Sequence, residues 1–176
     1  MNRIVSSSTA DHLLIRHLPR LDVQAGLFAG LMGGVAEILW IELYAATGAV
    51  QAGAVAAEVT ATVSPGLAES QWAVSSGIAI HMALALGIGV LFVSALRFAG
   101  SRISGPLQLV AAGLTFGAAI WAFNFFVLLP QINPEFVALV PHAIALPSKL
   151  LFGLGLACGP LVRWTRRAGG LSERGR

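Results

Sequence analysis

Apolar residues fall into four long runs along the chain, at residues 23–47, 72–96, 107–129 and 136–162. Each run exceeds the roughly 20 residues that an α-helix needs to cross about 30 Å of hydrocarbon at ~1.5 Å per residue. The pattern therefore predicts an all-α fold, a bundle of four transmembrane helices. Because the runs are longer than the minimum, we expect the helices to tilt in the bilayer.

The connection between the first two runs is long and weakly apolar. Its middle, residues 51–63, is rich in alanine, and the sequence Ser64-Pro65-Gly66 is typical of a helix end. This segment is too short and too polar to cross a bilayer, so we predict a short interfacial or re-entrant helix, with an irregular loop as the alternative. The connection at residues 130–134 begins and ends with proline, which predicts a tight turn.

Basic residues are sorted along the chain. Of the eleven Lys and Arg residues, ten lie before the first run, between the second and third, or after the fourth. The other two connections carry only Glu58, Glu69 and Glu135. The positive-inside rule then predicts a multi-pass protein of the bacterial inner membrane with both termini in the cytoplasm.

This topology divides the chain into three parts. Residues 1–21 form a cytoplasmic lead, residues 22–162 the four-helix membrane domain, and residues 163–176 a basic cytoplasmic tail. The lead contains apolar residues beside His12, Arg16 and His17, so it is either a short helix on the membrane surface or a disordered tail.

Composition excludes a soluble domain. The chain is 56% hydrophobic and only 11% charged, whereas about a quarter of the residues in soluble domains are charged. The basic residues flank apolar runs and form no patch, so the expected partner is the lipid bilayer and not a nucleic acid. Cys158 is the only cysteine, which excludes a disulfide framework within the chain.

Small residues recur at four-residue spacing, or multiples of it, in every run. Such rows let helix backbones approach closely in lipid, where association rests on packing rather than on expulsion of water. They favour a compact bundle, and they are also compatible with association with a second copy or a larger membrane complex. The predicted helix-packing positions are Gly26, Gly30, Gly34, Gly113, Gly117, Gly155 and Gly159.

Three segments carry a resemblance: AGLFAG at residues 25–30, SGIAIHMALALGIG at residues 76–89 and PHAIALPSKLLFGLGLACG at residues 141–159. Through them the chain resembles small four-helix bacterial inner-membrane proteins of unknown function, over residues 25–159. The resemblance implies a fold and a location, and it implies no activity.

Polar residues inside the apolar runs are the candidates for function, because ionisable groups are costly within a bilayer. Helical periodicity places Glu37 within about 20° of the glycine face of its run, and Asn124 has the same relation to Gly113. Glu42 lies about 140° from Glu37, so it points toward the outer connection or a partner chain. We predict a buried polar cluster near the bundle axis, in the outer half or the centre of the membrane, comprising Glu37, Glu42, His81, Asn124, His142 and Lys149.

The preferred interpretation of this cluster is structural. Glu37 would pair with Lys149 or His81 inside a non-catalytic membrane subunit or scaffold. One alternative is a small transporter or a proton- or cation-conducting protein. A second is a haem or metal site that uses His81 and His142 with Glu37 or Glu42. A last one is lipid, quinone or small-molecule binding in an outer pocket lined by Trp40, Tyr44 and Trp121.

These alternatives predict different structures. A scaffold should pack the cluster without a cavity, whereas a transporter should have a cavity that reaches Glu37 and His81. A metal or haem protein should bring His81 and His142 to a common point. The sequence contains no nucleophile elbow, P-loop, dinucleotide fingerprint or zinc-protease motif, so we expect neither enzymatic activity nor a cofactor.

Overall fold

Helices account for all regular secondary structure in the described part of the chain. The computed structural model describes the backbone of residues 8–98 and 105–173, and the side chains of residues 23–98 and 105–163. The elements are α1 (Ser8–Ala46), α2 (Ala54–Val63), α3 (Pro65–Ala68), α4 (Ala73–Phe98), α5 (Pro106–Phe123), the π-helical η2 (Asn124–Leu128), α6 (Leu129–Ile132), α7 (Pro134–Leu139) and α8 (His142–Glu173).

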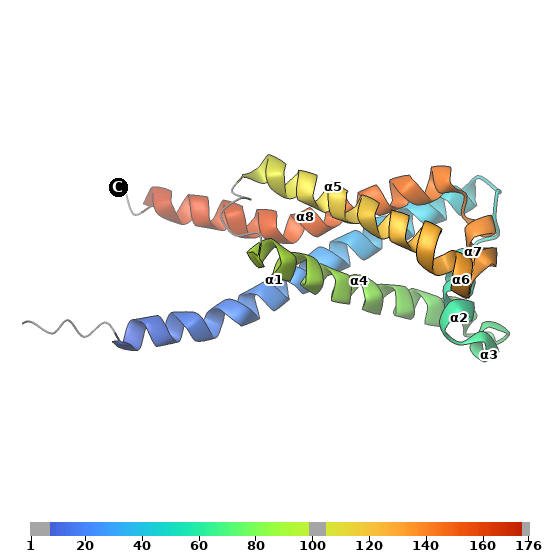
Figure 1. Cartoon of the computed structure of the whole chain (residues 1–176), viewed down its shortest axis with the longest axis horizontal. Helices are drawn as coiled ribbons and strands as arrows, with labels where there is room; N and C mark the ends of the chain where they lie inside the picture. Colours follow the sequence, from blue (N-terminus) through green and yellow to red (C-terminus); the bar gives the residue numbers. More distant parts are fainter. Residues whose placement is uncertain (1–7, 99–104, 174–176) are drawn as a thin grey trace, which may run out of the picture.

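Four stretches are long and apolar enough to cross a membrane: Val23–Ala46, Ala73–Phe98, Pro106–Ile132 and His142–Arg163. The predicted all-α fold with four membrane helices is therefore confirmed. Helix α1 begins and α8 ends at the same end of the molecule, which we call the terminal end (Figure 1). Helices α2, α3 and α7 lie at the opposite end, which we call the α2 end.

The long helices pack in the order α4, α1, α8, α5. Helix α1 lies against both α4 and α8, and α8 also packs against α5. The two outer helices of the row, α4 and α5, approach each other at one point, where the Phe92 and Phe116 ring centroids are 5.3 Å apart. Phe92 also belongs to a core of buried residues from α1, α4 and α8, which includes Ala29 and Leu156, and Phe116 packs against this core.

Glycines line the contacts between the long helices. A Cβ atom at Gly30 would lie against the Ala85 carbonyl oxygen and 2.7 Å from Leu86 Cα, so α1 and α4 touch backbone to backbone there. On the other face of α1, a Cβ at Gly155 would lie 2.5 Å from Gly33 Cα. The seven glycines predicted from the sequence are all buried and face another helix: Gly26, Gly30 and Gly34 meet α4, Gly113 and Gly117 meet α8, and Gly155 and Gly159 meet α1.

The fourth membrane helix begins later than predicted. The sequence analysis placed its start at Phe136, but residues 134–139 form the separate helix α7 and α8 starts at His142. Val140, between them, has extended backbone angles (φ −116°, ψ 94°). Pro141 accounts for this, because the ring of a proline disfavours the helical conformation in the residue before it.

The predicted turn at residues 130–134 is also largely wrong. The third membrane helix continues through Pro130 to Ile132, and the chain reverses only at Asn133. Proline lacks the amide hydrogen that a helix interior uses. The π-helical turn immediately before it, in which Leu129 N–H donates to Asn124 O, accommodates the change in hydrogen bonding.

The helix predicted within residues 51–63 exists as α2. It packs against the first turns of α4, where Thr60 Oγ1 donates to Ala73 O. Within the lead predicted for residues 1–21, residues 8–21 belong to the same helix as the first membrane span, α1, and residues 1–7 lie outside the described chain. At the other end, α8 extends through most of the predicted tail, to Glu173.

Candidate functional site

A cavity of about 650 Å³ occupies the part of the bundle toward the α2 end. Its sides come from α4 and α5, its floor from α1 and α8, and its end from α2 and the segment η2–α7. Phe116, which contacts Phe92, lines it on the side of the terminal end. Small-molecule sites in proteins typically measure about 300–1,000 Å³, so the cavity has the size of a ligand site.

The cavity opens sideways between α4 and α5. Leu84 and Leu91 of α4 and Phe123 of α5 all line it, and they are 57%, 60% and 54% exposed. Exposed apolar side chains on both edges mark the opening as a surface that faces lipid when the four helices span a membrane. A hydrophobic molecule can therefore reach the cavity from the bilayer.

A buried ion pair lies at the floor. Lys149 Nζ of α8 donates to Glu37 Oε1 of α1, and Ser148 Oγ donates to the same oxygen at 3.0 Å. Glu37 is only 7% exposed, and the Lys149 ammonium lies 5.8 Å from the centre of the Phe152 ring. Pairing and hydrogen bonding allow two charges to remain away from bulk water.

His81 brings a third helix to the same region. It lines the cavity from α4, and its Nε2 lies 3.3 Å from Gly34 O, one turn before Glu37 on α1. A carbonyl oxygen can only accept a hydrogen bond, so Nε2 carries a proton in this contact. Glu37, His81 and Lys149 all lie roughly two turns from the helix end nearest α2.

Asn124 lines the cavity from the start of η2. It is half-buried, and its side-chain amide makes no hydrogen bond to the residues that the structure describes. The π-helical turn changes the register of the following residues, and π-turns of this kind occur frequently at functional sites. Asn124 thus supplies a free donor and a free acceptor to the cavity.

Glu42 and His142 do not lie in the buried cluster. Glu42 is exposed and lines the cavity near the end of α1, without an ion pair or hydrogen bond to any described residue. His142 is also exposed, and its ring stacks on Phe126 with centroids 5.1 Å apart. Trp121 and Phe125 approach the same imidazole edge-on, at 5.9 and 5.6 Å.

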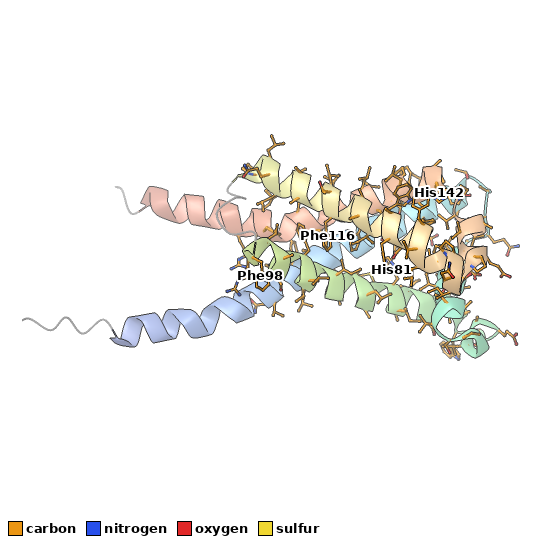
Figure 2. All side chains as sticks on the ribbon, in the orientation of Figure 1. His81, Phe98, Phe116 and His142 are labelled. Atoms are coloured by element: carbon orange, nitrogen blue, oxygen red, sulfur yellow. The ribbon has the colours of Figure 1, made fainter. Side chains whose placement is uncertain are left out.

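The two predicted histidine ligands have different surroundings. His81 lines the cavity and faces α1, whereas His142 starts α8 and packs among aromatic rings from α5 and η2. The two histidines lie at separate places in the bundle (Figure 2). Within the described residues, no three side chains of His, Cys, Asp or Glu gather in an arrangement that would hold a metal ion.

The sequence analysis missed Ser148 and the polar bridge that holds α2. Asn133 Nδ2 donates to Glu58 Oε1 at 2.8 Å and to Thr62 Oγ1 at 2.7 Å. Its Oδ1 accepts from Phe136 N, which caps α7. An asparagine directly before a proline is a recognisable helix-start signal, but its link to α2, far away in the sequence, has no local signal.

Comparisons of the chain with protein-family models, with curated proteins and with solved structures found no match. The arrangement of the site is therefore the basis for a functional proposal. Apolar walls open toward lipid, and a small set of polar groups is gathered at the floor. Such a cavity can hold the apolar part of a molecule and orient its polar part.

Proposed function

We propose that this membrane protein binds a hydrophobic or amphiphilic small molecule in the cavity between α4 and α5. The observation that carries the proposal is that the cavity reaches the Glu37–Lys149 pair and His81. Bilayer-facing walls select apolar ligands, and the buried polar groups select the chemistry of the ligand's other end. No enzymatic step is part of this proposal.

This proposal departs from the scaffold interpretation of the sequence. A scaffold was expected to pack Glu37 and Lys149 without a cavity, but both side chains line one. The transporter interpretation expected a cavity that reaches Glu37 and His81, and this feature is present. Transport across the membrane would further require that Phe92 and Phe116, which close the cavity toward the terminal end, move apart.

Photolabelling of the purified full-length protein tests the proposal. A neutral alkyl diazirine attaches to lipid-facing residues in proportion to its concentration, but a bound probe attaches to its site saturably. We expect saturable labelling of peptides from α4 and α5 that line the cavity, with mass spectrometry as the readout. Labelling that rises linearly at every position would contradict the proposal.

A matched pair of variants identifies the site. Ala119 of α5 lines the cavity, whereas Ala111 of the same helix is exposed and does not line it. Ala119→Trp should fill the cavity and remove the saturable labelling, while Ala111→Trp should leave it unchanged. Equal effects of the two substitutions would place the labelling outside the cavity.

We further propose that the protein lies in the bacterial inner membrane with both termini in the cytoplasm. The support is the distribution of Lys and Arg, which are absent from both connections at the α2 end. The α2 end, and with it the cavity, then belongs to the periplasmic half of the bilayer. Self-association and membership in a larger complex stay predictions.

A further inference from the structure

The charges that line the cavity do not balance. Among the described lining residues the charged side chains are Glu37, Glu42 and Lys149. Glu37 and Lys149 neutralise each other. Glu42 has no cationic partner among the described residues, so its carboxylate is left without a lysine or arginine to balance it.

The hydrogen-bonding groups that remain free in the lining are mostly acceptors, which also favours a cation. Glu42 offers two carboxylate oxygens, and Glu37 has its second oxygen, because both hydrogen bonds that it accepts end on Oε1. Apart from His81, the described lining side chains that can still donate into the cavity are Asn124 and Lys149, and the Lys149 ammonium is already engaged by Glu37.

From this asymmetry we infer that the ligand is a lipophilic cation, an apolar molecule that carries a single positive charge. The inference rests on the proposed function and adds the charge of the ligand to it. The cation lies in the cavity near Glu42, with Glu37 Oε2 as an acceptor deeper inside, while the apolar body contacts the walls. An anion in the same place would face the Glu42 carboxylate without a free cation to hold it.

The walls suit a cation as well as an apolar body. Phenylalanine rings from four parts of the fold line the cavity: Phe116, Phe123, Phe125, Phe136 and Phe152. Aromatic faces attract cations, and this attraction strengthens when the cation is removed from water. A cation whose charge is covered by apolar groups also loses less hydration on leaving water than a compact ammonium ion does.

Two ions of matched shape test the sign of the charge. Tetraphenylphosphonium and tetraphenylborate both carry four phenyl rings on a central atom and differ chiefly in charge. Each is added as a competitor of the saturable diazirine labelling of the full-length protein. Free concentrations are corrected for partition into protein-free micelles, because the two ions enter micelles unequally.

We expect the phosphonium to compete at a free concentration at least about tenfold lower than the borate, a modest preference for one unpaired carboxylate at a partly exposed position. Glu42→Gln should reduce that preference about three- to tenfold by removing the charge. Glu69→Gln is the control, because Glu69 is an exposed carboxylate outside the cavity, and it should leave the preference unchanged.

The outcomes separate the two proposals. Saturable labelling that the borate displaces as well as the phosphonium, or that neither ion displaces, overturns the cationic ligand and leaves the hydrophobic site in place. A preference for the phosphonium that survives Glu42→Gln also overturns the role of Glu42. If labelling is not saturable at all, the proposed function fails first, and the charge inference fails with it.

Discussion

The Glu37–Lys149 pair shows how single residues constrain this fold. Moving a charge out of water is expensive, and a buried pair offsets that cost only through close contact and further hydrogen bonds. Here Lys149 and Ser148 both donate to one oxygen of the Glu37 carboxylate, roughly two turns inside the helix ends. The pair therefore ties α1 to α8 at a fixed register, and it forms the polar end of the cavity.

Removing one member of this pair should destabilise the protein more than removing both. Glu37→Gln leaves the Lys149 ammonium buried without its counter-charge, at a cost of about 3 kcal/mol or more. Adding Lys149→Met to that variant removes the isolated charge, so the melting temperature in detergent should recover most of the loss. Glu42→Gln is the control with little expected effect, because Glu42 is exposed and unpaired in the described structure. A double variant that melts as low as Glu37→Gln would show that the pair is not the cause.

At the scale of elements, glycine contacts decide how closely the helices approach. Without a hydrophobic driving force between helices in lipid, close backbone contact and packing hold them together. Helix α1 uses two faces for this purpose, one with Gly30 toward α4 and one with Gly33 toward α8. The position of α1 between α4 and α8 is what brings Glu37 near both His81 and Lys149.

Gly30→Leu should sharply lower the folded yield and the melting temperature. A Cβ atom at Gly30 would already collide with backbone atoms of Ala85 and Leu86, which cannot move independently of α4. Gly87→Leu is the matched control, since a Cβ at Gly87 meets nothing within 4 Å. Size-exclusion profiles and melting curves in the same detergent give the comparison. Equal behaviour of the two variants would mean that the contact between α1 and α4 adjusts easily.

Asn133→Ala should loosen α2. It removes the side chain that joins Glu58 and Thr62 to the start of α7, and losing a buried hydrogen-bonding partner costs about 1–3 kcal/mol. Hydrogen exchange of residues 54–63 should become faster while exchange in the centre of α4 stays slow. Asn124→Ala is the control, because the Asn124 amide has no hydrogen bond to the described residues. If hydrogen exchange in α2 does not change, apolar packing alone holds this helix in place.

The sequence predicts the elements better than it predicts their ends and contacts. Hydropathy alone located four membrane helices, because a span must be long and apolar whatever it packs against. The α2 helix was predicted from its alanine content and the helix-end signal Ser64-Pro65-Gly66. It misplaced the start of α8, where Pro141 acts locally, and it did not foresee the π-turn before Pro130. A π-turn depends on a single change of hydrogen-bond partner in the backbone, and the spacing of apolar residues does not reveal such a change.

For the site, the chemical type of a residue was a better guide to its contacts than its spacing along the chain was. Glu37 and Lys149 pair because buried charges need partners, which the sequence already implies, and His81 lines the same cavity. Burial of Glu42 and His142 was expected from their place within apolar runs, yet both are exposed, since each lies within about one turn of a helix end. The sequence offered a cavity only as an alternative, because its walls come from helices that are far apart in the sequence.

At the scale of the whole molecule, the two ends of the bundle differ in charge as well as in structure. The α2 end holds three helical segments, the cavity and connections that carry Glu but neither Lys nor Arg. The terminal end receives the basic segments. Because translocation of short basic segments is disfavoured, this asymmetry is the basis of the orientation proposed for the protein and its cavity.

Reporter fusions test this orientation. Fusions after Thr60 or at Gln131, both at the α2 end, should give a periplasmic signal, and fusions after Ser101 or Arg167 should give a cytoplasmic one. The physical reason is the same for all four sites: Lys and Arg flank the membrane helices only on the terminal side, so that side stays in the cytoplasm. Paired alkaline phosphatase and green fluorescent protein fusions at each site supply the control, because the former is active only outside and the latter fluoresces only inside. A cytoplasmic signal after Thr60 would reverse the layout and would place the cavity in the inner half of the bilayer, where its ligand would have to come from the cytoplasmic leaflet.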